Sequence, residues 1–213
     1  MPEGKMESYS LYKYADYDQY LQCQIRTNRK KLHRTWVTEV TIMKIVNYLT
    51  SLIPYPTLGL CHGTRSGFEQ RMFMSHLPGC TVIGTEIAPT ASAFPNTIEW
   101  DFHNMKPEWE GAADFVYSNS LDHSYDPEKA LGVWVDSLKP SGLCFLESWA
   151  TTNCVQGSSS DPFSWSYAGI YDLISRWGLN KYGIFNTFFL GRKKINNRYI
   201  KGQIIVIKKG TEK

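Results

Sequence analysis

The chain has 213 residues, 42% hydrophobic and 20% charged, a composition that suits one globular domain with a sizeable core and excludes a disordered chain. Its net charge of +3 does not by itself indicate a nucleic-acid partner. No apolar run approaches the roughly 18 residues that a membrane span needs. The first five residues lack the apolar stretch of a secretory signal, and the five cysteines form no C-x-x-C pair. We therefore expect a cytoplasmic protein without a metal site.

Residues 1–50 are expected to form an N-terminal arm and a lid helix. Five tyrosines stand among acidic and basic residues before position 21, which favours a segment packed over the surface of a domain. A basic run follows at 26–34. Across 32–49, apolar side chains recur at intervals of three and four positions, which predicts one amphipathic helix. We expect this arm and helix to help close a pocket against water.

Short apolar runs alternate with helical patterns in the remainder, 51–213, which we expect to be a single domain. The expected strands are residues 57–61, 81–85, 97–100, 114–118, 143–146, 182–190 and 203–208. The expected helices are 68–77, 127–138 and 162–177. Pro and Gly between 139 and 142 predict that the helix at 127–138 stops there.

This order of elements predicts the fold class. Strands that alternate with helices indicate a parallel sheet covered on both faces. The last two strands are joined by the polar, basic loop 191–198, so they must be antiparallel neighbours. We predict an α/β, single-domain, Rossmann-like sandwich of three layers, with a mostly parallel seven-stranded sheet and an antiparallel C-terminal hairpin.

In such sheets, ligands bind outside the carboxyl ends of the strands, so the residues that follow each strand are candidates. The first strand runs into a turn at Gly63 and Gly67, where the backbone can approach a ligand closely. The second strand ends at Glu86, about 20 residues past that turn, where a carboxylate suits the two hydroxyls of a ribose. The third runs into Asp101 and Phe102, a carboxylate and a ring that suit adenine.

The order of these features resembles the class I S-adenosylmethionine-dependent methyltransferases. Residues 112–123 resemble the family's fourth motif, and 138–143 resemble the turn of its fifth, usually written L-K-P-G-G. The resemblance covers 57–208 and implies S-adenosyl-L-methionine as cofactor. It implies that the cofactor is bound by residues that follow the first four strands: Cys61, His62, Gly63, Thr64, Arg65, Glu86, Ile87, Asp101, Phe102, Asn119 and Ser120.

The first motif departs from the family pattern, an acidic residue in the strand followed by G-x-G-x-G. Gly59 stands at the acidic position, and Cys61 and Arg65 replace glycines. The acidic residue normally helps to hold the methionine ammonium group, so a main-chain carbonyl or Glu69 must substitute for it. Arg65 can instead meet the methionine carboxylate or an acidic substrate.

The predicted reaction is methyl transfer to a small molecule, a sugar or a lipid-linked acceptor. An oxygen nucleophile needs a general base, and we name His123, with Asp122 beside it, because an imidazole ordinarily has a pKa of about 6.5. The D/N-P-P-Y/F signature of amino methyltransferases is absent, since Asn119 is followed by Ser120 and Leu121. Two alternatives stay open: a nucleic-acid methyltransferase, supported by the basic segments, and a protein that binds the cofactor without catalysis. The missing G-x-G-x-x-G disfavours a nicotinamide dehydrogenase. The acceptor and the oligomeric state are left open.

Overall fold

The computed structural model describes residues 8–195 and 197–210. The helices are α1 (Tyr17–Lys31), α2 (Glu39–Leu52), α3 (Phe68–His76), α4 (Pro127–Asp136) and α5 (Gly169–Trp177). The strands are β1 (Tyr9–Leu11), β2 (Leu58–His62), β3 (Thr81–Glu86), β4 (Thr97–Glu99), β5 (Ala113–Ser118), β6 (Leu138–Ala150), β7 (Phe163–Trp165), β8 (Tyr182–Ile195) and β9 (Arg198–Lys209). Short 3-10 turns lie at Pro89–Ala93, Pro107–Trp109 and Leu121–His123. None of the helices in the described ranges has the length and apolar character that crossing a membrane requires.

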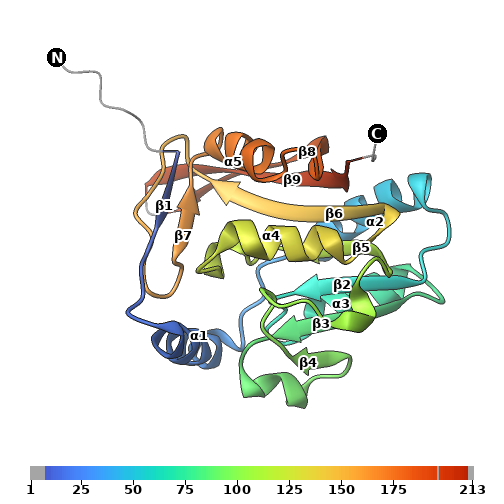
Figure 1. The fold of residues 1–213 in the computed structure, drawn as a ribbon, viewed down its shortest axis with the longest axis horizontal. Helices are drawn as coiled ribbons and strands as arrows, with labels where there is room; N and C mark the ends of the chain where they lie inside the picture. The colour runs from blue at the N-terminus through green and yellow to red at the C-terminus, as the bar shows by residue number, and fades with distance from the viewer. Residues whose placement is uncertain (1–7, 196, 211–213) are drawn as a thin grey trace.

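The main sheet confirms the predicted fold class. It has seven strands in the order β4-β3-β2-β5-β6-β9-β8, parallel from β4 to β6, with β9 antiparallel to both β6 and β8. After β2 the chain adds β3 and β4 on one side of it and then β5 and β6 on the other side. Ligands bind at the switch point between β2 and β5 that this order creates. In Figure 1 the arrows of β2, β3 and β6 run toward the side of the molecule that carries α1.

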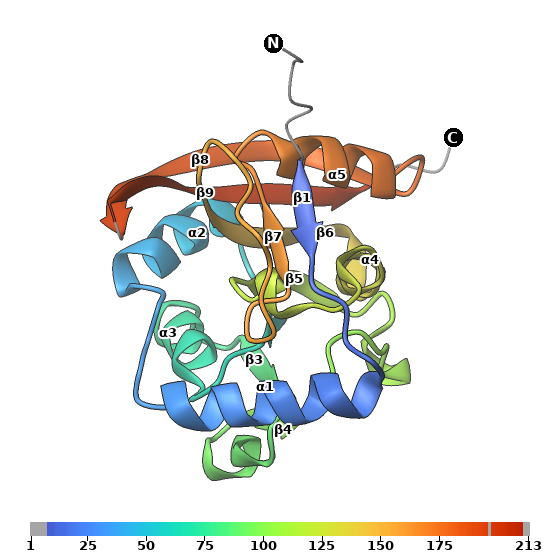
Figure 2. The ribbon, with the colours of Figure 1, turned by 90° about the vertical axis from the view of Figure 1, so that its left-hand side faces the viewer.

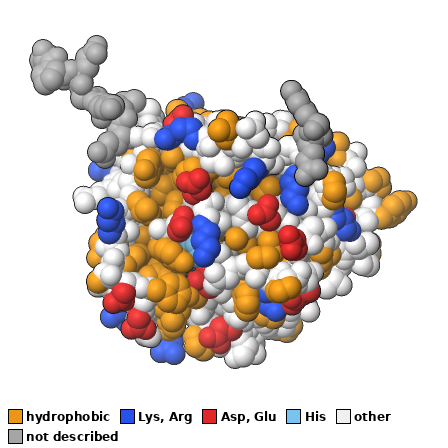
Figure 3. Space-filling view, in the orientation of Figure 1, with side chains coloured by type: hydrophobic (Ala, Val, Ile, Leu, Met, Phe, Trp, Pro, Cys, Tyr) orange, Lys and Arg blue, Asp and Glu red, His pale blue; other side chains and the backbone are white. Residues whose placement is uncertain are grey.

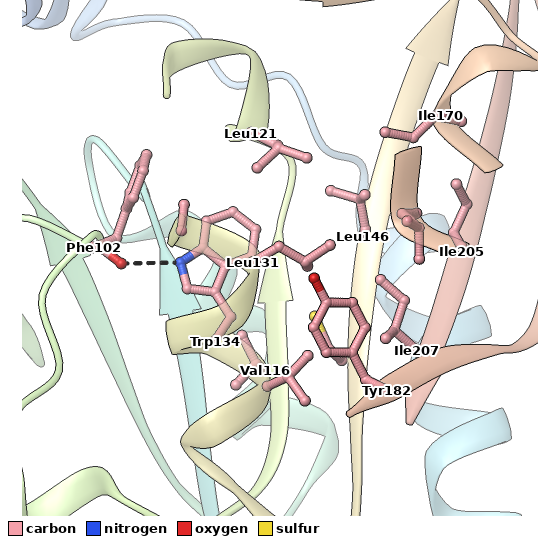
Figure 4. Packing of buried hydrophobic residues seen from close by; sticks show 14 of the residues in the cluster. Phe102, Val116, Leu121, Leu131, Trp134, Leu146, Ile170, Tyr182, Ile205 and Ile207 are labelled. Atoms are coloured by element: carbon pink, nitrogen blue, oxygen red, sulfur yellow. Dashed lines mark hydrogen bonds between the residues drawn. The ribbon is translucent and has the colours of Figure 1, made fainter. Parts of the chain in front are cut away.

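Two hydrophobic cores hold the three layers together. On one face of the sheet, α4 and α5 pack over residues that include Val116, Leu146 and Ile205 (Figure 4). Trp134 of α4 is fully buried there, and its indole N–H donates to the main-chain oxygen of Phe102 over 3.2 Å. On the other face, α2 and α3 pack over the sheet. The cluster there includes Phe73 of α3, Phe115 of β5 and Phe145 of β6.

The N-terminal segment differs most from expectation. The predicted single helix at 32–49 is wrong in its first half, because α2 begins only after Thr38, whose hydroxyl accepts the N–H of Thr41 over 3.2 Å. A second helix, α1, precedes it and is capped by Asp16. Hydrophobic periodicity does not reveal α1, because its buried face carries mostly polar side chains: Tyr20, Cys23, Gln24, Thr27 and Asn28.

Three further boundaries change. The first part of the predicted helix at 162–177 is β7, which pairs with β1 in a separate two-stranded sheet. The segment 139–142, predicted to be a break after the helix, lies inside β6. Most of the predicted loop at 191–198 belongs to β8 and β9, which pair as far as Ile195 and Arg198. The terminal hairpin therefore extends beyond the sheet that it closes.

The arm lies across the carboxyl ends of the strands. Figure 2 looks onto this edge and shows α1 crossing it, with β1 and β7 above. Tyrosines of the arm and Tyr125 pack edge to face in series, with ring centroids 5.0 Å apart for Tyr12 and Tyr14, 5.3 Å for Tyr14 and Tyr20, and 4.6 Å for Tyr20 and Tyr125. Figure 3 shows hydrophobic side chains gathered toward this side of the molecule. Aromatic packing thus fixes the arm over the edge where ligands bind in such folds.

Candidate functional site

Two adjoining cavities lie at the carboxyl ends of the parallel strands. The larger has a volume of about 410 Å³, and the smaller has a volume of about 40 Å³. Four residues line both cavities: Gly63, Arg65, Ser120 and His123. The predicted cofactor loop and the predicted acceptor loop therefore meet at one place.

The loop after β2 is shaped by its backbone conformation. Gly63 has a φ of +73°, and a Cβ atom there would come within 2.5 Å of the Ser120 side chain, so only glycine fits. The N–H groups of Gly63 and Thr64 both donate to the main-chain oxygen of Thr85, over 2.9 and 3.0 Å. Arg65 also adopts a positive φ, of 47°, although a side chain disfavours that region. The loop is thus held against β3 and β5 at the edge of both cavities.

Glu86 lies at the end of β3, is only 7% exposed and lines the smaller cavity. Its Oε2 accepts from the N–H of Arg65 and its Oε1 from the N–H of Ala88, each over 3.1 Å. Burial raises the pKa of this carboxyl, while the Ala88 N–H and the nearby charge of Arg65 counteract the rise. An ionised carboxylate has about four acceptor sites, so two remain for a ligand.

Asp101 follows β4 and is held by two other residues. Its Oδ2 accepts the hydroxyl of Tyr17 over 2.8 Å, and its Oδ1 lies 2.6 Å from Nδ1 of His103. Burial alone would raise the pKa of Asp101, but the bonds from His103 and Tyr17 outweigh it and hold the pKa below its ordinary value. The Nε2 atom of His103 lies 2.7 Å from the fully buried hydroxyl of Ser124. Asp101 is therefore an ionised, oriented acceptor that α1 covers.

Helix α1 supplies a wall of the site, through side chains that no sequence pattern singles out. Tyr20, Gln24, Thr27 and Asn28 line the smaller cavity opposite Glu86 and Ile87. Asn28 is 5% exposed, and its Nδ2 has no hydrogen-bond partner among the described residues. An unsatisfied buried donor is costly, so this amide is poised for a ligand acceptor.

The loop after β5 lines the larger cavity through Asn119, Ser120, Asp122 and His123. The Nδ1 atom of His123 lies 2.9 Å from the main-chain oxygen of Ser160 and 3.1 Å from Oε1 of Gln24. Both neighbours are acceptors, so Nδ1 carries the hydrogen and the neutral ring keeps its lone pair at Nε2.

Asp122 lies beside this imidazole. Its Oδ1 has no hydrogen-bond partner in the described part of the chain, and burial raises the pKa of this carboxyl while His123 counteracts the rise. Asp122, His123 and Asp161 offer ligand atoms within 4.8 Å of one another, but Lys31 already pairs with Asp161 over 3.3 Å. We assign no metal to this cluster.

Three of the predicted residues line neither cavity: Asp101, Cys61 and His62. The side chains of Cys61 and His62 point to opposite faces of the sheet, and neither is among the described residues that line the cavities. The His62 ring stacks on Trp134 at a centroid distance of 5.3 Å. Burial lowers the pKa of His62 to about 3, so it is a neutral core residue and not a base. Only the backbone of these two residues remains available to a ligand.

A buried carboxylate on β6 was missed by the sequence analysis. Glu147 lines the larger cavity, and its two oxygens accept the hydroxyl of Tyr117 over 2.6 Å and the indole N–H of Trp149 over 2.7 Å. Lys193 of β8 lies over the Trp149 ring, 3.9 Å from its centroid. Glu147 directly follows the predicted strand 143–146, so the rule that residues after a strand are candidates could have marked it.

Comparisons with known proteins agree with the fold. No protein-family model matches the sequence, and no curated protein matches it. The structure is similar to 1,6-didemethyltoxoflavin-N1-methyltransferase from Burkholderia thailandensis, crystallised with 1,6-didemethyltoxoflavin and S-adenosylhomocysteine, at a TM-score of 0.68, 13% identity and coverage of 93% and 92% of the two chains. It is similar to the plantazolicin methyltransferase BpumL in complex with S-adenosylhomocysteine, at a TM-score of 0.56, 10% identity and 92% of each chain. It is also similar to the [4+2]-cyclase SpnF, at a TM-score of 0.66, 9% identity, and 95% and 100% of the chains. The chain therefore has the Rossmann-like fold of class I methyltransferases, as predicted.

Proposed function

We propose that this protein transfers a methyl group from S-adenosylmethionine to a small-molecule, sugar or lipid-linked acceptor. One observation carries the proposal: the glycine loop and the loop after β5 share Gly63, Arg65, Ser120 and His123 between two adjoining cavities. A cofactor on the first loop and an acceptor on the second would therefore be in contact. The methyltransferases of this fold that bind S-adenosylhomocysteine support the proposal.

The residues present fit the cofactor. The Gly63 backbone leaves a cradle that a Cβ atom would fill, Glu86 keeps free acceptor sites for the ribose hydroxyls, and the unpartnered Nδ2 of Asn28 lies on the same cavity. Asp101 is an ionised acceptor suited to the adenine amino group, with Phe102 next to it. We assign the nucleoside to this side and the methionine part to the larger cavity.

The bound cofactor would supply an activated methyl group on a sulfonium centre, so the chain needs to align the acceptor, exclude water and take one proton. The Nε2 lone pair of His123 can take a proton from a hydroxyl or amine acceptor, and Ser160 holds the ring through Nδ1. Asp122, a carboxylate beside it, would stabilise the charged imidazolium that results. Helix α1 and the loop at 32–38 would form the lid of this site.

The experiment is titration with S-adenosylhomocysteine, followed by turnover with methyl-labelled S-adenosylmethionine and a panel of hydroxyl and amine acceptors. Binding together with transfer of label supports the proposal, while absence of binding at millimolar ligand rules it out. Binding without transfer to any acceptor favours the alternative of a protein that binds the cofactor without methylating. The fold alone does not exclude this outcome, because a structure similar to this one is that of a [4+2]-cyclase. The basic end of the β8–β9 hairpin favours the nucleic-acid alternative, for which RNA binding that weakens steeply with salt is the test.

A further inference from the structure

We infer that Glu69 binds the α-ammonium group of the methionine part of S-adenosylmethionine, which makes it the residue that selects a cofactor carrying an amino acid. The inference rests on the proposed function and deepens it.

Glu69 is a buried carboxylate with one oxygen that lacks a donor. It stands in the first turn of α3, is 7% exposed and lines the larger cavity together with the loop from Gly63 to Ser66. Its Oε2 has no hydrogen-bond partner among the described residues. A buried carboxylate oxygen left unsatisfied is costly, so the fold maintains here an acceptor that a ligand with N–H or O–H groups would satisfy.

The methionine ammonium is the cofactor group that can donate a hydrogen bond to this oxygen. Glu86 marks the nucleoside side at the smaller cavity, and Gly63 lies between the two cavities, so the methionine part extends toward Glu69. The cofactor has two cationic centres, but a sulfonium has no hydrogen to donate, whereas an ammonium group offers three donors. Charge-assisted bonds of this kind are the strong ones.

No acidic side chain can take this role from β2. A Cβ atom at Gly59 would lie 2.2 Å from the Phe115 ring, because that ring fills the space beside the strand. The neighbouring carboxylate, Glu147, already has both oxygens bound by Tyr117 and Trp149. Asp122 also has an unpartnered oxygen, but it stands on the loop after β5, on the acceptor side beside His123.

The test compares three ligands by titration calorimetry on the full-length protein and on Glu69→Gln. S-Adenosylmethionine carries both cationic centres, S-adenosylhomocysteine carries only the ammonium, and 5′-methylthioadenosine carries neither. We expect Glu69→Gln to weaken the first two at least tenfold and to leave 5′-methylthioadenosine within twofold. The unchanged third ligand also shows that the variant is folded. Glu147→Gln is the matched control, since it removes one buried charge from the same cavity and should not separate the three ligands.

Each other result overturns the inference. Loss confined to S-adenosylmethionine would assign Glu69 to the sulfonium, and equal loss of all three ligands would assign it to the fold or the nucleoside side. If Asp122→Asn rather than Glu69→Gln weakens the two amino-acid ligands selectively, the ammonium lies at the other end of the cavity. If the unchanged protein binds none of the three, it is the proposed function that fails.

Discussion

The hydroxyl group of Tyr17 donates a hydrogen bond to Oδ2 of Asp101 over 2.8 Å, so a residue of the N-terminal arm occupies the acceptor that we assign to adenine. Along the same helix, Gln24 lies 3.1 Å from His123, and Asn28 accepts the hydroxyl of Thr90 over 2.8 Å. The cavity that α1 leaves beside Glu86, about 40 Å³, has room for only about three water molecules. A nucleoside can enter only if α1 moves outward.

Tyr17→Phe is expected to tighten the binding of S-adenosylhomocysteine. The change removes a hydrogen bond that holds α1 closed and that competes for Asp101, while the ring stays to pack against Tyr125. Since the pair is partly exposed, we expect about a threefold to tenfold lower Kd and a faster association rate, corresponding to roughly 1 kcal/mol. Stopped-flow fluorescence with calorimetry measures both.

Tyr12→Phe is the control for this change, because Tyr12 belongs to the same aromatic series and its hydroxyl makes no hydrogen bond with the described residues. It should leave both constants unchanged. Weaker binding in Tyr17→Phe would mean that the hydroxyl is a wall of the nucleoside site and not a latch.

Glu86→Ala is expected to weaken S-adenosylmethionine binding by about 2 kcal/mol, the order of hydrogen bonds to a charged acceptor. The structure adds a complication, since Glu86 also accepts the N–H groups of Arg65 and Ala88 and so holds the loop itself. Glu86→Gln keeps an oxygen for one of these bonds and should lose less. Calorimetry that shows full affinity in Glu86→Ala would remove this residue from the site, and the exposed Glu99→Ala is the control.

The sheet was predictable from the sequence because each of its elements carries a local signal. Buried parallel strands appear in the sequence as short apolar runs. A helix such as α4 appears as a stripe of apolar residues that follows Pro127. Helix α1 within the arm was not predictable, because it buries Gln24 and Asn28 against the smaller cavity and not against a hydrophobic core. The pairing of β1 with β7 joins Tyr9 to Trp165, a contact between distant segments that no local pattern contains.

Some residues of the candidate site were also predictable from the sequence, and others were not. Residues that follow a strand, such as Glu86 and His123, were found from topology alone, because the carboxyl ends of parallel strands share one edge. Cys61 and His62 stand in the same stretch but within the strand, where alternation turns their side chains into the two cores. Glu147 directly follows the predicted strand 143–146 and was missed because candidates were taken only from the first four strands.

His123→Ala is expected to lower the rate of methyl transfer to a hydroxyl acceptor by about 100-fold or more, the low end for loss of a general base. The Kd for S-adenosylhomocysteine should change far less than the rate, because the Nε2 atom acts on the acceptor. Single-turnover kinetics with labelled cofactor separates the two effects. His76→Ala, which changes a half-buried residue at the end of α3 that pairs with Glu39 and lines neither cavity, is the control. An unchanged rate would mean that the reaction proceeds by alignment alone.

The last prediction concerns the free energy of unfolding without ligand. Burial raises the pKa of Glu69 to about 7 from an ordinary 4.5; Arg65 lowers it, while Glu147 and Glu86 raise it further. Because the folded pKa is the higher one, the contribution of Glu69 to stability is complete below pH 4.5. It falls as pH rises to about 7 and is constant above, a loss of about 3 kcal/mol.

Glu69→Gln has no proton to lose, so its stability relative to the unchanged protein should rise by this amount between pH 4.5 and 8. Urea denaturation across that range measures the difference, and the other buried carboxyl groups cancel because both proteins contain them. Glu99→Gln, an exposed substitution, should run parallel to the unchanged protein. A constant difference between Glu69→Gln and the unchanged protein would mean that Glu69 is solvated in the free protein, so that its ionisation costs no stability before an ammonium group binds.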